Sequence, residues 1–115
     1  MSHATLIDEE LTAARVAWKD GNEGKARVCA RRAVAHAAES WLAREAEPRW
    51  RGDAMEHLRR IQQEPSIPVP IRQAAERLAT AVTRRRDAPF TADPIMDANI
   101  IIAHLTAETR DARLP

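Results

Sequence analysis

Two groups of arginines are the residues of this chain best suited to bind an anion. They are Arg27, Arg31 and Arg32 in the first group, and Arg84, Arg85 and Arg86 in the second. The first group lies on one side of a helix, because its spacing is i, i+4 and i+5. Guanidinium groups bind carboxylate and phosphate through paired hydrogen bonds, so two groups that met in space would form an anion or phosphate patch. The structural alternative is that Arg84–Arg86 stabilise the negative end of a helix, while Arg27 and Arg31 pair with Glu23 and other acids.

Trp50 is the best single candidate for a contact residue, since it stands between Arg49 and Arg51. An exposed tryptophan flanked by arginines can stack on a nucleobase or enter a partner interface. The alternative is that its ring folds back over the core. Trp18 and Trp41 fall on apolar stripes, and we predict that both belong to the core.

Histidine and cysteine supply weaker candidates. His36 with Glu39, and His104 with Glu108, are each one helical turn apart, so each pair can place two metal ligands on one face. Such pairs are common on solvated helices and no HExxH signature accompanies them, so we predict no metal site. Cys29 near a helix start is either an activated nucleophile or a small buried hydrophobe. The second interpretation is favoured, because no base stands at a recognisable spacing.

The composition of the chain limits the kind of fold that can position these residues. With 115 residues, 44% hydrophobic and 30% charged, the chain is predicted to form one globular domain over residues 1–115. Of 18 basic residues only Lys19 and Lys25 are lysines, leaving 16 arginines, yet the net charge of +1 gives no global argument for nucleic-acid binding. A single cysteine excludes an internal disulfide. No signal-peptide pattern or membrane-length apolar run is found, so the cytoplasm is the expected location.

Glycine and proline, which break helices, divide the chain into five segments with helical periodicity. The expected helices cover residues 5–20, 23–46, 53–63, 70–86 and 93–108, followed by a polar tail at 109–115 that we expect to fray. Asn22, Asp53 and Asp93 are placed as N-caps. The pattern predicts an all-α, up-and-down bundle of about five helices.

The second helix is expected to lie at the centre of this bundle. Its alanines at positions 26, 30, 33 and 37 continue the stripe to Trp41, and small side chains let neighbouring helices approach closely. Elsewhere the predicted buried residues are Met55, Leu58, Ile61 or Gln62, Ile67, Val69, Ile71, Ala74 or Ala75, Leu78, Val82, Ile95, Ala98, Ile102 and Leu105.

The order of these features resembles the HEPN domain, a helical bundle, over roughly Leu6 to Leu105. The segments that carry the resemblance are Gly21–Arg27 before the long helix, Ala37–Leu42 at its end, Glu56–Leu58, Thr83–Pro89 and Asp97–Ile101. The resemblance implies a bundle that often dimerises. Some members are ribonucleases that use an arginine and a histidine a few residues apart, and others are partners of nucleotidyltransferases.

The family's nuclease motif is not matched at its usual place. No histidine follows Arg84–Arg86 within reach, and Arg51 with His57 has the nominal spacing but lies at the third helix. The resemblance therefore implies a non-catalytic, dimeric module that uses its arginine-rich faces to bind a protein partner, such as a nucleotidyltransferase-like protein, or a nucleotide-like anion. The alternatives are a ribonuclease that uses Arg51 and His57 across a dimer, and a metal-dependent helical enzyme.

Overall fold

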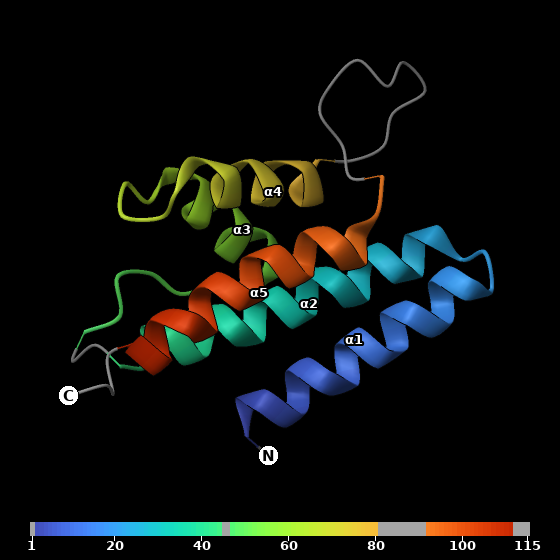
Figure 1. Cartoon of the computed structure of the whole chain (residues 1–115), viewed down its shortest axis with the longest axis horizontal. Coiled ribbons are helices and arrows are strands. Elements are labelled where there is room, and N and C mark those ends of the chain that lie inside the picture. Colours follow the sequence, from blue (N-terminus) through green and yellow to red (C-terminus); the bar gives the residue numbers. More distant parts are fainter. Residues whose placement is uncertain (1, 45–46, 81–91, 112–115) are drawn as a thin grey trace.

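The computed structural model of the chain describes residues 2–44, 47–80 and 92–111 (Figure 1). These residues form five helices and no strand. The helices are α1 (His3–Lys19), α2 (Glu23–Leu42), α3 (Ala54–Gln63), α4 (Val69–Ala79) and α5 (Pro94–Asp111). The predicted all-helical bundle is confirmed.

Side-chain caps explain where most of the helices begin. Ser2, Asn22 and Asp53 each accept a hydrogen bond from the backbone N–H three residues later, at 2.9–3.1 Å. Asp93 accepts from the N–H groups of residues 95 and 96 at the start of α5. Each cap satisfies a backbone donor that has no partner within its own helix. The three predicted caps are confirmed, whereas α4 begins without a side-chain cap and carries Pro70 in its first turn.

The helices pack around α2 (Figure 1). α1 and α2 form an antiparallel hairpin, and Gly21 between them adopts the left-handed conformation, with φ of 80°. α5 packs along α2 and runs in the same direction, and α4 packs on α5 in the opposite direction. The short α3 contacts both α2 and α4. None of the described helices is long and apolar enough to span a membrane.

The core follows from the side chains of α2. All five residues of its predicted stripe are buried, and Val34, Ala38 and Leu42 widen the buried face. A helix buried over so wide a face must have neighbours on several sides, as α1, α3 and α5 are here. The predicted central position of this helix is confirmed.

Some predicted core positions are wrong. Met55 is 44% exposed, because it lies in the first turn of α3 and borders a surface groove with Val28 and Arg31. Val69 is 52% exposed, because α4 begins at that residue and the preceding turn has already buried Ile67. Trp18 is only half-buried.

The predicted end of the fourth helix is also wrong. α4 ends at Ala79, since Thr80 has an extended backbone. Helix α2 is likewise shorter than predicted, because it ends at Leu42. The last helix is longer than predicted, because residues 109–111 of the expected tail belong to α5. Val82, Arg84–Arg86 and residues 112–115 lie outside the described residues.

Candidate functional site

The first arginine group of the sequence prediction is used mainly for structure. Arg27 pairs with Glu23 one turn away, at 3.6 Å. Arg31 donates from Nε to the carbonyl oxygen of Leu78 at 2.8 Å, which ties α2 to the last turn of α4. Burial, followed by the charge of Arg27, lowers the pKa of Arg31 from its ordinary value. Arg32 is exposed. Because Arg84–Arg86 lie outside the described residues, the predicted patch of two groups stays a prediction.

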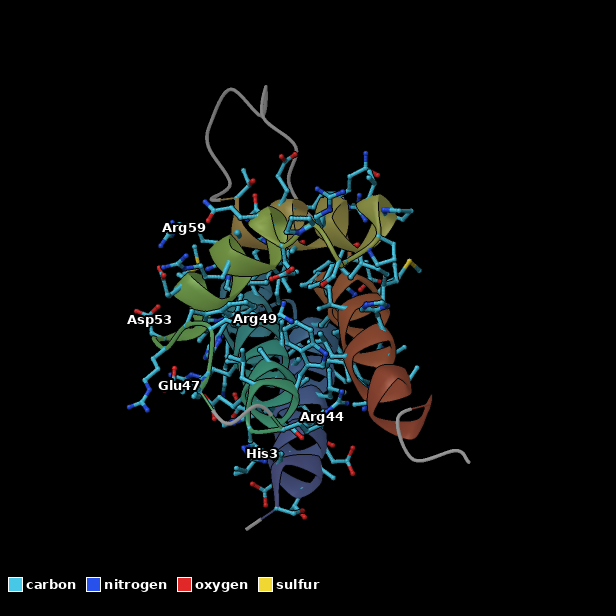
Figure 2. The ribbon with its side chains drawn as sticks, turned by 90° about the vertical axis from the view of Figure 1, so that its left-hand side faces the viewer. His3, Arg44, Glu47, Arg49, Asp53 and Arg59 are labelled. Atoms are coloured by element: carbon cyan, nitrogen blue, oxygen red, sulfur yellow. The ribbon has the colours of Figure 1, made fainter. Side chains whose placement is uncertain are left out.

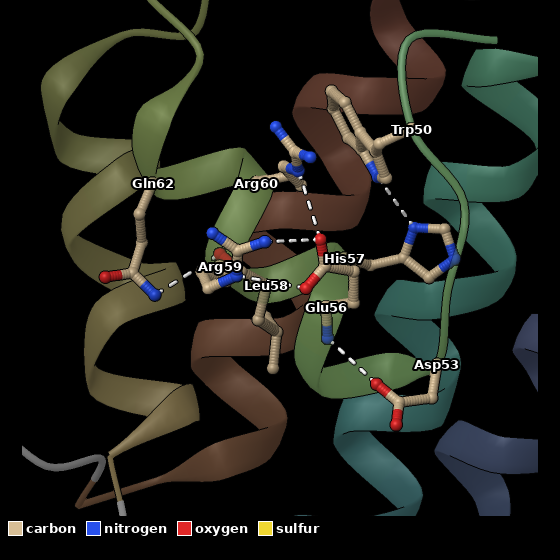
Figure 3. Close-up of polar contacts among 8 residues, drawn as sticks. All are labelled: Trp50, Asp53, Glu56, His57, Leu58, Arg59, Arg60 and Gln62. Carbon is tan, nitrogen blue, oxygen red and sulfur yellow. Dashed lines mark hydrogen bonds and ion pairs between the residues drawn. The ribbon is translucent and has the colours of Figure 1, made fainter.

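Further described arginines also hold elements of the fold together. Arg77 makes a paired contact with Asp97 that joins α4 to α5, at 2.9 and 3.2 Å. The carboxylate of Glu56 accepts hydrogen bonds from both Arg59 and Arg60 on the surface of α3 (Figure 3). Arg49 also pairs with Glu64, and Arg72 donates to the carbonyl oxygen of Ile67. Abundant arginine therefore does not by itself imply an anion-binding surface here.

Trp50 is not the exposed stacking residue that its neighbours suggested. Its side chain is buried, and its ring lies 5.9 Å from the ring of Trp41 at the end of α2. Its indole N–H donates to Nδ1 of His57 at 3.0 Å (Figure 3). The Trp50 ring thus folds back over the core, as the alternative interpretation of this residue required.

Gly52 allows that segment to pass close to α3. Its φ is 147°, in the region that favours glycine. A Cβ atom at this position would lie 2.6 Å from Cβ and Cγ of Glu56, which is too close for any neighbour. Glycine is therefore needed between Arg51 and the N-cap Asp53, and it sets where Trp50 and Arg51 lie relative to His57.

His57 is the most unusual polar residue of the structure. It is only 2% exposed and sits in the first turns of α3. Because Nδ1 accepts the hydrogen bond of Trp50, the neutral ring carries its proton on Nε2. This Nε2 has no hydrogen-bond partner among the described residues, and its nearest acid oxygen, Oε1 of Glu39, is 3.7 Å away. Burial lowers the pKa of His57, outweighing the opposite effect of nearby carboxylates.

Histidines from α1, α2 and α3 lie around the carboxylate of Glu39. Its Oε2 lies 3.9 Å from Nε2 of His3 and 3.9 Å from Nδ1 of His36, on the other side from His57. Figure 2 shows His3 at the start of α1, close to the end of α2. These distances exceed hydrogen-bond length, so the carboxylate keeps its capacity to accept further bonds. No group of three or more metal-ligating side chains suited to an ion occurs among the described residues.

A pocket of about 340 Å³ opens beside these residues. It is bounded by the end of α2, the segment that follows it, and the start of α3. The described residues that line it are Glu39, Leu42, Ala43, Pro48, Trp50, Arg51, Gly52 and His57. The walls are mainly apolar, and the titratable residues among the lining are Glu39, Arg51 and His57. Arg51 and His57, which have the nominal spacing of such a motif, therefore share one pocket.

The sequence prediction did not identify Glu39 as the residue that the histidines surround, and it gave His3 no role. The prediction named Glu39 only as a neighbour of His36. Cys29, by contrast, is buried, as the interpretation of this residue as a small buried hydrophobe predicted. The contacts of Glu39 to His3 and His57 join residues far apart in the chain, so no local spacing could reveal them.

Comparison with known proteins adds no relative, since no family model, curated protein or solved structure matches this chain.

Proposed function

We propose that this chain is a non-catalytic, HEPN-like helical module that binds a nucleotide-like ligand in the pocket beside His57. Ligand pockets in proteins are mostly apolar clefts of about 300–1,000 Å³ with a few converging polar groups. The pocket of Glu39, Arg51 and His57 has this character, at about 340 Å³. A base suits its apolar walls, and the exposed Arg51 at its lining suits a phosphate.

The observation that carries the non-catalytic part is the hydrogen bond from Trp50 to His57. A general base needs a free lone pair, and the lone pair of neutral His57 is already occupied on Nδ1. Protonating Nδ1 would place two N–H groups face to face at 3.0 Å and would lose that bond. The one proton of the neutral ring stays on Nε2, which the protein covers and which lies 3.7 Å from Oε1 of Glu39, so proton transfer by His57 is opposed.

Binding of nucleoside monophosphates, measured by calorimetry at low ionic strength, tests this function. We expect Arg51→Gln to weaken binding by about tenfold, because it removes a charge-assisted contact to phosphate. Arg32→Gln is the matched control, since Arg32 is exposed on α2 and does not line this pocket. Absence of binding at millimolar nucleotide, or equal loss in both variants, would refute the proposal.

A ribonuclease is the second candidate, favoured by the shared position of Arg51 and His57 at one pocket. If the chain cleaves RNA through His57, the purified protein must degrade single-stranded RNA and His57→Ala must not. Trp50→Phe removes the N–H that holds Nδ1, so it would raise such an activity. No cleavage by the native protein would exclude this candidate.

Dimerisation through α5 is the assembly that we propose for the module. Met96 and Ile100 are 59% and 36% exposed, and Ala103 and Ala107 continue the same side of the helix at exposed positions. A continuous apolar stripe on a surface helix is typical of an interface, and a symmetric pair of such helices covers both stripes at once. A nucleotidyltransferase-like protein remains the protein partner that the HEPN resemblance predicts.

A further inference from the structure

We propose that the pocket beside His57 prefers guanine among the bases, with Glu39 and His57 contacting the edge of the base. This inference rests on the proposed nucleotide-binding function. It starts from a buried donor without a partner: Nε2 of His57 belongs to a side chain that is 2% exposed, and it has no hydrogen bond to any described residue. A buried donor left without a partner is unfavourable, and a ligand acceptor would satisfy it.

The acceptor beside that donor is a carboxylate. Oε1 of Glu39 lies 3.7 Å from Nε2 of His57, so one donor stands next to two acceptor oxygens. Nε2 of His57 is itself covered, whereas the Glu39 side chain is 46% exposed, so the proposed complex requires Glu39 to turn and admit the edge of a flat ligand between itself and His57. His3 and His36 contact only its other oxygen, at distances longer than a hydrogen bond.

Guanine matches this arrangement of hydrogen-bonding groups. Its edge offers one acceptor, O6, followed by two neighbouring donors, N1–H and the 2-amino group. In the proposed complex His57 donates from Nε2 to O6, and the two oxygens of Glu39 accept from N1–H and the 2-amino group. Adenine, cytosine and uracil each offer Glu39 one donor beside one acceptor for His57, so they leave one carboxylate oxygen without a ligand bond.

The remaining residues of the pocket complete the match. Leu42, Pro48 and Trp50 give apolar surface for the faces of the base, and Arg51 is placed to take the 5′-phosphate. Reading the edge of a base while packing its faces is a common mode of nucleotide recognition. A simple anion would use Arg51 alone and would face the carboxylate of Glu39 unfavourably.

Inosine monophosphate provides the sharpest test, since it differs from GMP only by the missing 2-amino group. We expect GMP to bind about tenfold more tightly than IMP, because one charge-assisted hydrogen bond is worth about that factor. Glu39→Gln replaces one acceptor oxygen by a donor, so GMP should then bind no better than IMP. The matched control Glu9→Gln changes an exposed acid on α1 that lies outside this pocket, and should leave the ratio unchanged.

The outcomes separate this inference from the proposed function. Equal binding of GMP, IMP and AMP, with dependence on Arg51, would overturn the guanine preference and leave the nucleotide-binding function standing. Binding of none of the three would overturn both. A GMP preference that survives Glu39→Gln would also overturn the inference, because another group would then read the base.

Discussion

The hydrogen bond between Trp50 and His57 determines what the most buried histidine can do. It fixes the proton of the neutral ring on Nε2, and burial opposes the charged form. A histidine held neutral inside the fold is also a source of pH dependence, because the unfolded chain can protonate it freely. The same contact that limits proton transfer therefore makes a measurable prediction about stability.

We expect the free energy of unfolding to fall as the pH is lowered from about 7.5 to about 5.5. The pKa of His57 is lowered on folding, so below its unfolded pKa of about 6.5 the unfolded state binds more protons than the folded state. The contribution is present above that value and is lost as the pH falls through it. Urea unfolding at both pH values measures the effect. His57→Asn keeps an acceptor for Trp50 without titrating, and an undiminished pH dependence in that variant would contradict the assignment.

Gly52 gives a second prediction at the scale of one residue. Gly52→Ala should destabilise the fold by about 1–3 kcal/mol, because the backbone conformation is strained for alanine and the new Cβ would overlap Glu56. Gly21→Ala is the control, since Gly21 also has a positive φ but has open space around it. Chemical denaturation of both variants compares them. Equal losses would mean that backbone conformation alone explains the requirement at position 52.

At the scale of elements, α4 is held by arginines from its neighbours as well as by its own. Arg31 of α2 reaches the carbonyl of Leu78 in its last turn, and Arg77 of α4 reaches Asp97 of α5. Leu78 itself is fully buried, so the polar contacts surround an apolar anchor. The helix is short, and tertiary contacts of this kind supply stability that a helix of its length lacks in isolation.

We expect Arg31→Met to lower the free energy of unfolding by about 1–2 kcal/mol, because methionine keeps much of the packing and removes the bond to Leu78. Arg32→Met is the neighbouring control and should change stability by less than about 0.5 kcal/mol, since Arg32 is exposed. Urea unfolding of the two variants separates them. A loss of the same size in both would show that the contact to α4 adds nothing.

At the scale of the whole molecule, the described exposed apolar residues are unevenly placed. Met96 and Ile100 follow one side of α5, whereas Val16 is a single large apolar side chain on the exposed side of α1. Scattered exposed apolar residues are ordinary, but a stripe along one helix is typical of an interface. The proposed dimer is therefore expected to depend on α5 and not on α1.

Light scattering at micromolar concentration tests the dimer. The native chain of 12.9 kDa should give about twice that mass. Met96→Glu should give the mass of one chain, because a charge would be buried in the symmetric interface. Val16→Glu is the control at nearly equal exposure, 57% against 59%, and should remain dimeric. A single-chain mass for the native protein would rule the dimer out.

Periodicity and capping in the sequence were sufficient to predict the five helices and most of their starts, but not the ends of α2 and α4. Asn22, Asp53 and Asp93 start helices as predicted, and the alanine stripe of α2 is buried as predicted. Errors fall at helix ends, as at Met55 and Val69, because burial there depends on which neighbour covers the first turn.

The sequence by itself determined that the chain is helical, that α2 is central and that Arg51 and His57 are worth examining together, because these depend on spacing within one segment. Only the tertiary structure decided what His57 can do. Its partners are Trp50, reached by a loop that needs Gly52 to turn, and Glu39, which lies on another helix. Local sequence specifies the elements through backbone geometry, whereas tautomer, burial and pocket depend on contacts between residues distant in the chain.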